Sequence, residues 1–450
     1  MTGPFVVIGG DAAGMSAASK ARREDPDREI IVFERGDWVS YGACGLPYYV
    51  KGDIADLQDL VSVTPTEFRE ERNIDLRTNH EVLGINIETE TVTVAGPDET
   101  FEQAYGDLLI GTGASAIVPP IDGIELPDIY TLHDMEDGKA IRERVLESES
   151  VQRAGIVGGG YVGIEMAEAL KAQGVDVQIF EMLPQVLAPF GEAVGEAVAE
   201  ELRAKDVNLH LETTVEGFEG DNSVTGVNTP DETVPVDFVL VGAGVSPNVA
   251  LAEEAGIEIG STGAIATDEY GHTSAENVYA AGDCAEMNHA VTGEPDHVPL
   301  ALSANRAGRA IGQTVAGDPH PVGSIVGTAA VKAFDLEAAR TGILDEERAK
   351  AAGFDPVTET ITSRSRAGYY PNGKEITVTL VADKSSKQLL GGSIVGAEGV
   401  PKRVDTIATA LHNGMTVPEF EGLDLSYAPP FGPTWDPVLT AAKVLGGSFE

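Results

Sequence analysis

Short apolar runs that end in glycine or in an acidic residue recur along the chain. The first, Phe5–Ile8, leads into a glycine-rich stretch at 9–14, and an alanine-rich helical pattern continues from there through Arg23. A second apolar run at 30–33 then ends in Glu34. Continuous apolar runs of this length are typical of buried parallel strands. The order strand, glycine loop, helix, strand therefore predicts a βαβ unit.

The same order returns in the middle of the chain. An apolar run at 154–157 enters a glycine loop at 158–163, and a helical pattern continues through Lys171. The next apolar run, 177–180, ends in Glu181. Two such units in one chain predict a doubly wound α/β protein.

Beyond about residue 325 the pattern changes. The stretches 376–381 and 391–396 are typical of antiparallel strands with helices between them. We therefore expect an α/β fold with two Rossmann-like dinucleotide-binding domains and a separate C-terminal α+β domain. The expected limits are 1–114 with 245–325 for the first domain, 115–244 for the second and 326–450 for the third.

Composition narrows the class of partner. The 450 residues carry 30 Lys and Arg against 73 Asp and Glu, which gives a net charge of −43. Such a surface repels nucleic acid and anionic membranes, so we expect neither as a partner. The acidic excess fits either solubility in very high salt, as in a halophile, or docking of a basic partner. Because the acidic residues are spread along the whole chain, we favour high salt.

The cysteine content and the N-terminus indicate a compartment. Two cysteines cannot form a disulfide framework, which favours a reducing cytosol. The N-terminus enters a strand directly, without a basic region or a long apolar segment. We therefore expect no signal peptide and no membrane span, and a cytoplasmic protein.

The two glycine loops have the chemistry of phosphate binding. Glycines at Gly-x-Gly-x-x-Gly spacing let the backbone approach a diphosphate at a helix N-terminus. Gly158, Gly160 and Gly163 match this spacing in full, whereas Asp11 replaces the second glycine in the first loop. One such loop could be a tight turn of any α/β protein. Two loops, each with strand, helix and acidic residue in place, favour two dinucleotide sites.

Cys44 is the candidate reactive residue. It stands in the glycine- and proline-containing stretch 40–48, before an expected helix start. Partial positive charge at a helix N-terminus lowers a thiol pKa and makes the sulfur nucleophilic. The alternative is a small buried apolar residue, which we expect Cys284 to be. Asp283, at the end of a strand, could hold a flavin polyol or could cap a helix.

These motifs together resemble the pyridine nucleotide–disulfide oxidoreductases, over essentially the whole chain. The resemblance implies FAD in the first domain, NAD(P)H in the second and a homodimer formed by the third. The implied FAD residues are Gly9, Gly10, Ala13, Gly14, Glu34, Val82, Thr112, Gly113 and Asp283. The implied NAD residues are Gly158, Gly160, Tyr161, Gly163, Glu181 and Gly244. Glu181 would repel a 2′-phosphate, which favours NADH, with NADPH as the alternative. No metal site is expected.

The chain resembles the single-cysteine branch of that family. Tyr49 stands where dithiol members have a second cysteine, and the C-terminal region has Tyr427-Ala428-Pro429-Pro430 in place of an acid–base histidine pair. These features and Tyr369-Tyr370-Pro371 are similar to CoA-disulfide reductase. Ala12 replaces a histidine of the oxidase and peroxidase members, so the resemblance favours disulfide reduction over peroxide chemistry.

The resemblance also implies residue roles. Cys44 would form a mixed disulfide with coenzyme A, and Tyr427 with Tyr369 or Tyr370 of the partner subunit would protonate the leaving thiolate. The basic residues Lys20, Arg22 and Arg23, with Ser40, would bind the coenzyme A phosphates, and Arg364 and Arg366 could add to them. The alternative for the basic residues is a solvated helix face. Ala43 stands where many members have asparagine, so one polar contact near the thiol is missing.

Three other functions stay open at this stage. An NADH oxidase would cycle Cys44 through a sulfenate. A persulfide reductase would use the same thiol, although we expect no appended sulfurtransferase-like domain. A flavin redox sensor without turnover would not need the second nucleotide loop.

Overall fold

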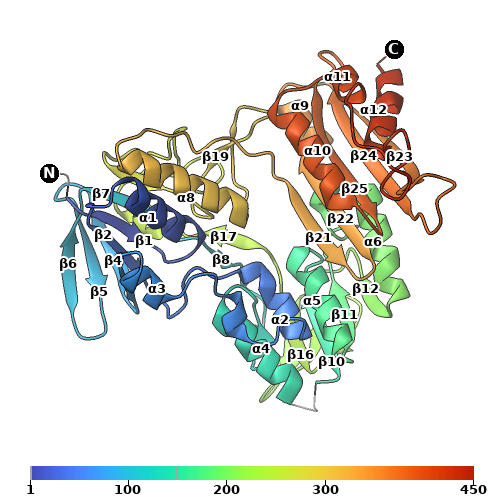
Figure 1. The fold of residues 1–450 in the computed structure, drawn as a ribbon. Coiled ribbons are helices and arrows are strands. Elements are labelled where there is room, and N and C mark those ends of the chain that lie inside the picture. Colours follow the sequence, from blue (N-terminus) through green and yellow to red (C-terminus); the bar gives the residue numbers. More distant parts are fainter. Residues whose placement is uncertain (1–2, 148–150, 450) are drawn as a thin grey trace.

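Two parallel sheets and one antiparallel sheet form the framework of the protein (Figure 1). The computed structural model describes residues 3–147 and 151–449. The first sheet has the order β18-β7-β1-β2-β3, and all its pairs are parallel. Its strands are β1 (Phe5–Ile8), β2 (Ile30–Glu34), β3 (Asp75–Thr78), β7 (Asp107–Ile110) and β18 (Val278–Ala280). The apolar runs of the sequence thus form buried strands, as expected.

The second sheet repeats this plan with the order β12-β11-β10-β16-β9. Its strands are β9 (Ile129–Tyr130), β10 (Arg153–Val157), β11 (Asp176–Phe180), β12 (Val207–His210) and β16 (Phe238–Val241). Two short antiparallel strands, β8 (Ala114–Ala116) and β17 (Val245–Pro247), pair with each other where the chain passes between the two units. This pairing supports domain limits near 114 and 245, which we keep as a proposal.

The C-terminal sheet is antiparallel, with the order β21-β22-β25-β24-β23. Its strands are β21 (Ala329–Ala333), β22 (Leu336–Gly342), β23 (Pro356–Arg364), β24 (Glu375–Asp383) and β25 (Leu389–Gly396). Ala329, Val331 and Ala333 alternate with exposed residues along β21 and share an apolar core with the second unit. The α+β expectation for this region is confirmed.

Helices cover the sheets and fix the position of the glycine loops. The longer ones are α1 (Ala12–Glu24), α4 (Met135–Glu147), α5 (Tyr161–Ala172), α6 (Glu192–Ala204), α8 (Ala301–Val315), α10 (Val400–His412) and α12 (Pro437–Gly447). The shorter ones are α2 (Leu46–Lys51), α3 (Pro65–Glu70), α7 (Ala250–Glu254), α9 (Glu346–Ala351) and α11 (Val417–Glu421). α8 packs along α1, α10 and α12 cover the C-terminal sheet, and α2 packs on α5.

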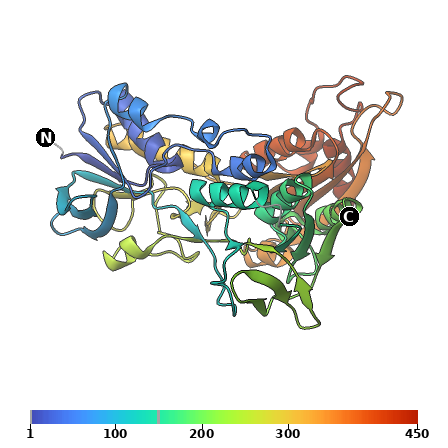
Figure 2. The ribbon, with the colours of Figure 1, turned by 90° about the horizontal axis from the view of Figure 1, so that it is seen from below.

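Smaller elements complete the units. Two three-stranded antiparallel sheets consist of β4 (Glu81–Asn86), β5 (Thr91–Ala95) and β6 (Thr100–Ala104), and of β13 (Gly217–Gly220), β14 (Val224–Asn228) and β15 (Thr233–Pro235). The pair β19 (Met287–Asn288) and β20 (Pro295–Asp296) precedes α8. The first unit and the C-terminal sheet lie at opposite ends of the molecule, and the second unit lies beside the C-terminal sheet (Figures 1 and 2). Among the described residues, no helix has both the length and the apolar composition needed to cross a bilayer.

The two glycine loops share one backbone geometry. A Cβ added to Gly14 would lie 2.0 Å from the carbonyl oxygen of Gly9, and one added to Gly163 would lie 2.1 Å from that of Gly158. Gly9 and Gly158 have φ of +105° and +106°, which favours glycine. Each loop therefore turns tightly from its strand into its helix, and the helix N-terminus faces the carboxyl ends of the strands.

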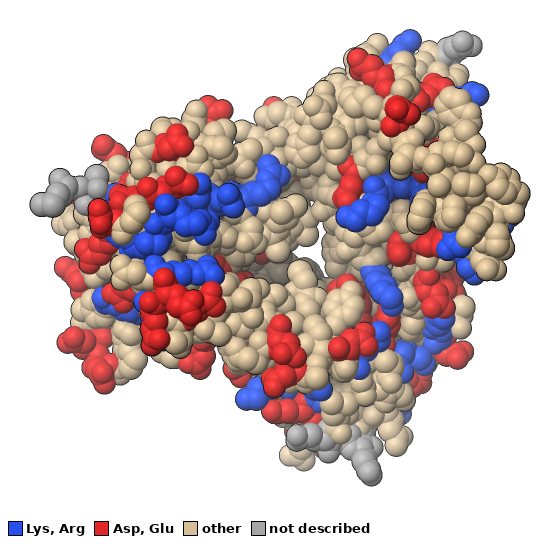
Figure 3. All heavy atoms as spheres, in the orientation of Figure 1, with Lys and Arg blue, Asp and Glu red and all other residues tan. Residues whose placement is uncertain are grey.

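Acidic side chains are spread widely over the visible face, whereas basic side chains form their densest group over α1 and smaller groups elsewhere (Figure 3). Charges of one sign repel each other across a compact surface, and salt screens that repulsion. The net charge of −43 thus opposes folding most strongly at low ionic strength.

We therefore expect the melting temperature to rise with salt. Raising KCl from about 0.1 M to about 1 M shortens the screening length from about 10 Å to about 3 Å, and each 1 kcal/mol of repulsion that is relieved should raise the melting temperature by about 1–2 °C for a chain of this length. Differential scanning fluorimetry over a KCl series measures this. Sucrose of equal osmolality, which does not screen charge, serves as the control. A melting temperature that is flat in KCl would contradict the expectation.

Candidate active site

Cys44 lies in a short turn directly before α2. The turn spans Ala43–Gly45, and Pro47 occupies the first turn of the helix, where a missing N–H is tolerated. A Cβ on Gly45 would lie 2.3 Å from a methyl carbon of Leu60, so a side chain at this position would displace the apolar cluster below. Glycine and proline thus hold Cys44 at the start of α2, as the sequence predicts.

The chain surrounds the thiol of Cys44 with negative charge. Cys44 is accessible to solvent, but partial burial raises its pKa, and the carboxylates of Glu165, Asp283 and Asp11 raise it further. The expected lowering by a helix N-terminus is therefore wrong for the polypeptide itself. The reason is that partial burial is the main influence on the pKa of this thiol and three carboxylates add to it, while α2 has only six residues.

The second cysteine is structural, as expected. Cys284 is fully buried, and its thiol lies 3.4 Å from the carbonyl oxygen of Ala281. A buried thiol in an apolar cluster is inert. Cys44 is thus the only accessible thiol among the described residues.

Asp11 joins the first glycine loop to the segment before Cys44. Its Oδ1 accepts a hydrogen bond of 3.1 Å from the backbone N–H of Tyr41, and the N–H of Ser40 donates to the carbonyl of Gly10 at 3.0 Å. Burial raises the pKa of Asp11 to about 6, and the charges of Glu34 and Asp283 add to that rise. Asp11, which replaces the second glycine of the first loop, therefore contacts the segment that leads to Cys44.

Glu34 and Glu181 occupy equivalent places in the two units. Glu34 Oε2 accepts a hydrogen bond of 2.7 Å from Gly10 N, and Glu181 Oε2 accepts one of 2.7 Å from Gly159 N. In each case the other oxygen accepts from the backbone N–H two residues beyond the glutamate, at 2.8 Å. Each acidic side chain predicted from the sequence is thus fixed against its own glycine loop, where it can meet a ribose hydroxyl.

Gly160 leaves open space at the start of α5. A Cβ added there would meet no atom within 4 Å, whereas Gly158 and Gly163 are pressed against backbone. Packing within the protein therefore does not require glycine at position 160. The space in front of the helix N-terminus fits the diphosphate of a dinucleotide. In the first loop Asp11 stands at this position.

Other residues predicted to bind FAD follow strands β7 and β18 of the first sheet. Thr112 Oγ1 donates to the carbonyl of Asn248 at 2.7 Å, and Asn248 N donates to the carbonyl of Gly113 at 2.9 Å. His297 Nε2 donates to the Asp283 carbonyl at 2.8 Å in the segment that follows β18, and burial raises the pKa of the Asp283 carboxyl.

Four of the predicted residues lie in other surroundings. Val82 lies in the core beneath the first sheet and Ala13 is buried on α1. Gly244 has φ +99° and faces Ile117, close to the crossing between the two units. The ring of Tyr161 packs edge-on against Phe190 with centroids 5.2 Å apart, at the first residue of α5.

A polar interface between α2 and α5 escaped the sequence analysis. Tyr48 Oη donates to Glu165 Oε1 at 2.9 Å. One turn further, Glu168 binds Lys51 at 3.1 Å and Lys332 of β21 at 2.5 Å. Tyr48 lies four residues after Cys44, and Glu165 lies four residues after Tyr161. Residues four positions apart lie on the same side of a helix, so this spacing from Cys44 and Tyr161 could have indicated Tyr48 and Glu165 as residues of the site.

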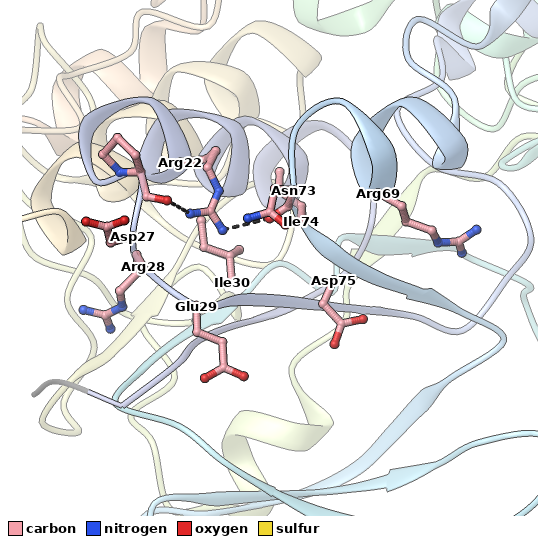
Figure 4. Close-up of a pocket in the computed structure, with 10 residues that line it drawn as sticks. Arg22, Asp27, Arg28, Glu29, Ile30, Arg69, Asn73, Ile74 and Asp75 are labelled. Atoms are coloured by element: carbon pink, nitrogen blue, oxygen red, sulfur yellow. Dashed lines mark hydrogen bonds between the residues drawn. The ribbon is translucent and has the colours of Figure 1, made fainter.

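Two of the three basic residues of α1 already bind other groups of the protein. Lys20 is buried and pairs with Glu24, and Arg22 donates to the carbonyls of Pro26 and Asn73. The bonds of Arg22 border a pocket of about 480 Å³ at the C-terminal end of α1 (Figure 4). That end lies opposite the glycine loop, so this pocket is separate from the site. Of the three predicted residues only Arg23 is exposed.

The three candidate tyrosines do not behave alike. Tyr369 and Tyr427 are exposed, and their hydroxyl oxygens lie 2.8 Å apart. The hydrogen bond with Tyr427 raises the pKa of Tyr369. Tyr370 instead packs beside the guanidinium of Arg366, which pairs with Glu398. Among the contacts of the described residues, none joins these hydroxyls to Cys44 within the chain.

Comparisons with known proteins agree with this geometry. Residues 3–304 match the family described as pyridine nucleotide-disulphide oxidoreductase, and residues 328–437 match its dimerisation domain. The NAD(P)H coenzyme A polysulfide/persulfide reductase of Pyrococcus horikoshii is 40% identical over 98% of both chains. The coenzyme A disulfide reductase of Staphylococcus haemolyticus is 30% identical over 95% of this chain and 96% of its own. The structure of a NAD-dependent persulfide reductase from A. fulgidus superposes with a TM-score of 0.95 at 38% identity, over 99% of this chain and 83% of that one.

Asp11→Asn should stabilise the protein at neutral pH and not at acidic pH. The pKa rise from 3.8 to about 6 means that the folded state binds the proton more tightly than the unfolded state. Stability is therefore lost as pH rises through this interval, by at most about 3 kcal/mol. Asparagine avoids that loss.

Melting temperatures of the wild type and of Asp11→Asn, measured between about pH 4.5 and pH 7.5, check this expectation. The advantage of the variant should be full at the upper limit and should shrink toward the lower one. An advantage that does not depend on pH would contradict it.

Proposed function

The chain belongs to the pyridine nucleotide-disulphide oxidoreductase family, and we propose that it is an FAD-dependent enzyme that reduces coenzyme A disulfide with NAD(P)H. The observation that carries this proposal is Cys44, one accessible thiol between two nucleotide loops and without a second cysteine nearby. A lone thiol must form its disulfide with an external partner. The coenzyme A names of the relatives supply the class of that partner.

The first glycine loop would hold FAD and the second NADH. Glu34 and Asp283 would bind hydroxyls of FAD, and Gly160 leaves the space for the nicotinamide nucleotide's diphosphate. Glu181 would bind a ribose 2′-OH and repel a 2′-phosphate, which supports NADH over NADPH. When bound, FAD supplies the passage of two electrons from the nucleotide to the sulfur centre.

Cys44 would exchange sulfur bonds with the substrate. Its thiolate attacks one sulfur of coenzyme A disulfide, so that a Cys44–sulfur bond forms, the substrate S–S bond breaks and one coenzyme A thiolate leaves with a proton. Two electrons then cleave the mixed disulfide, which frees the second coenzyme A thiolate and restores Cys44. The balance is one disulfide, one NADH and one proton to two thiols and NAD⁺.

Tyr369 and Tyr427 would deliver the proton to the leaving thiolate. Their hydroxyls share a hydrogen bond at an exposed position, which supports their entry into a neighbouring subunit's site. The match to a dimerisation domain supports a homodimer. Because Tyr370 packs beside Arg366, we assign the catalytic role to Tyr369.

Arg23 is the best-placed residue of the predicted phosphate cluster. The basic side chains over α1 form a dense patch with acidic side chains around it (Figure 3). Lys20 and Arg22 would support that patch indirectly, because both already bind protein groups. Ser40, with φ +49°, would contribute beside Cys44. We further propose a cytoplasmic location, where reduced coenzyme A is maintained.

A second function has support from the comparisons. The relative that is 40% identical is named a coenzyme A polysulfide/persulfide reductase, and the same Cys44 chemistry would cleave a persulfide carried by coenzyme A. An NADH oxidase is the weaker alternative, since Ala12 supplies no acid or base beside the thiol. A sensor without turnover would not need the open space at Gly160.

Cys44→Ser should abolish disulfide turnover and leave flavin reduction intact. Without the thiol no mixed disulfide can form, whereas the nucleotide loops are unchanged. Stopped-flow mixing with NADH or NADPH measures reduction of the flavin. A second mixing with coenzyme A disulfide, coenzyme A persulfide or oxygen then measures its reoxidation. Normal disulfide turnover in Cys44→Ser would reject the proposal. Faster reoxidation of the wild type by persulfide would select the second function.

Tyr427→Phe should lower kcat for disulfide reduction by about 100-fold, a typical contribution of general acid catalysis. The matched control is Tyr370→Phe, which removes a hydroxyl from the residue next to Tyr369 without removing either partner of the Tyr369–Tyr427 hydrogen bond. Steady-state assays compare both with the wild type. Equal effects of the two substitutions would contradict the assignment.

A further inference from the structure

The N-terminus of α6 has no side-chain cap. Its N-cap residue is Gly191, and no side chain of the described residues accepts a hydrogen bond at this helix end. The first N–H groups of a helix have no partner within the helix, so this end of α6 presents free donors and partial positive charge. Glu192, the acidic residue of the first turn, is exposed. An anion is the group that such a helix end binds best.

A buried hydroxyl of the C-terminal sheet faces this helix end. Ser393 of β25 is 1% exposed, and its Oγ has no hydrogen-bond partner among the described residues. A Cβ built on Gly191, where a capping side chain would start, lies 3.9 Å from this Oγ and, apart from adjacent backbone, meets no other atom within 4 Å. Buried polar groups are normally hydrogen-bonded, so the open space between Gly191 and Ser393 suits a bound group.

Arg340 lies on the same face of the sheet as Ser393. The two are directly opposite each other where β22 pairs with β25, and opposite residues of an antiparallel pair point to the same face. Ala338 and Val395, two positions along each strand, belong to the apolar core of the second unit. This face therefore meets the second unit, and α6 packs on both strands (Figure 1).

The charge of Arg340 has no carboxylate partner. Its guanidinium carbon lies 6.0 Å from the centroid of the Phe190 ring, and Phe190 directly precedes Gly191. Its Nε is buried without a hydrogen-bond partner, and Arg340 is in none of the ion pairs of the described chain. Acidic residues outnumber basic ones 73 to 30 in this protein, yet none neutralises this arginine.

We propose that a small monovalent anion, chloride, binds between the N-terminus of α6 and the pair Arg340–Ser393. The helix N–H groups, the Ser393 hydroxyl and the guanidinium can all donate hydrogen bonds to it. One formal positive charge calls for one negative charge, and a water molecule would leave the charge of Arg340 unbalanced. Because Ser393 is 1% exposed, the space is closed to a group as large as a nucleotide.

The ion would join the second unit to the C-terminal sheet. Phe190, beside Arg340, also packs edge-on against Tyr161 at the second glycine loop, with ring centroids 5.2 Å apart. The ion would thus hold the junction directly behind the predicted NAD loop. This role goes beyond the proposed function, because it requires neither the thiol nor a disulfide substrate.

Chloride-specific stabilisation tests the proposal. The FAD-loaded protein is freed of halide and melted in mixtures of KCl and potassium gluconate at a constant ionic strength of about 1 M. Screening is then equal throughout, and gluconate is too large for the space. The melting temperature should rise with the chloride fraction and reach a plateau. At about 100 times the Kd for chloride the rise should be about 3–5 °C.

Two variants remove the proposed ligands, and a third is the matched control. Arg340→Gln and Ser393→Ala should each abolish the chloride-specific rise, while the stabilisation by ionic strength alone remains. Arg203→Gln removes the same charge from the exposed C-terminal end of α6 and should keep the full rise. A rise of equal size in Arg340→Gln and Arg203→Gln would overturn the proposal.

Diffraction from the wild type tests the site even if a variant fails to fold. In crystals of the FAD-loaded protein soaked in KBr, the anomalous signal of bromine should give a peak between Gly191 and Ser393. The absence of that peak would overturn the proposal. A peak without a chloride-specific rise would also overturn it, because the ion would then bind at crystal concentration only. These measurements use no NADH and no disulfide, so their failure is distinct from absent disulfide turnover, which would reject the proposed function.

Discussion

The contact between α2 and α5 is the interaction on which the candidate site depends. α2 begins at Leu46, directly after the turn that carries Cys44, and α5 begins at the second glycine loop, so their packing sets the distance between the sulfur and the nicotinamide nucleotide's loop. Glu168 strengthens the contact by binding Lys51 of α2 and Lys332 of the C-terminal sheet. The Lys332 side chain is 47% exposed and that of Lys51 is 23% exposed, so each pair should contribute less than the about 3–5 kcal/mol that is typical of breaking a fully buried pair. One glutamate thus ties all three units together.

The same interface determines how charged side chains are distributed around the thiol of Cys44. Lysines are scarce in this chain, and two of them are used on Glu168, one helical turn away from the thiol-facing end. Around the sulfur itself the polypeptide provides carboxylates and hydroxyls. Burial and these carboxylates therefore favour the neutral thiol of Cys44 over the thiolate within the polypeptide. The general negative charge of the surface and the local charge of the site are separate problems, because salt screens the first and reaches the second much less.

Sequence patterns predicted the frame of the site and left its long-range contacts unresolved. The strands, the glycine loops and the start of α2 follow from local rules, and Glu34 and Glu181 lie where strand periodicity places them. The bond between Tyr48 and Glu165 joins residues 117 positions apart, and that between Lys332 and Glu168 joins residues 164 apart, so no local rule indicates them. The ion pair between Lys20 and Glu24 could have been predicted from the sequence, since residues at i and i+4 face each other on a helix.

The two glycine loops provide a comparison within one chain of what a single residue contributes. Both loops turn with nearly the same φ and press their third glycine against the same carbonyl. They differ at the second glycine position, where Gly160 leaves open space and Asp11 instead accepts a hydrogen bond from Tyr41. The second loop therefore keeps room for a nucleotide that must enter and leave. In the first loop Asp11 fills that space and holds the segment that leads to Cys44 by a hydrogen bond. This arrangement suits a cofactor that stays bound and a thiol that must be held beside it.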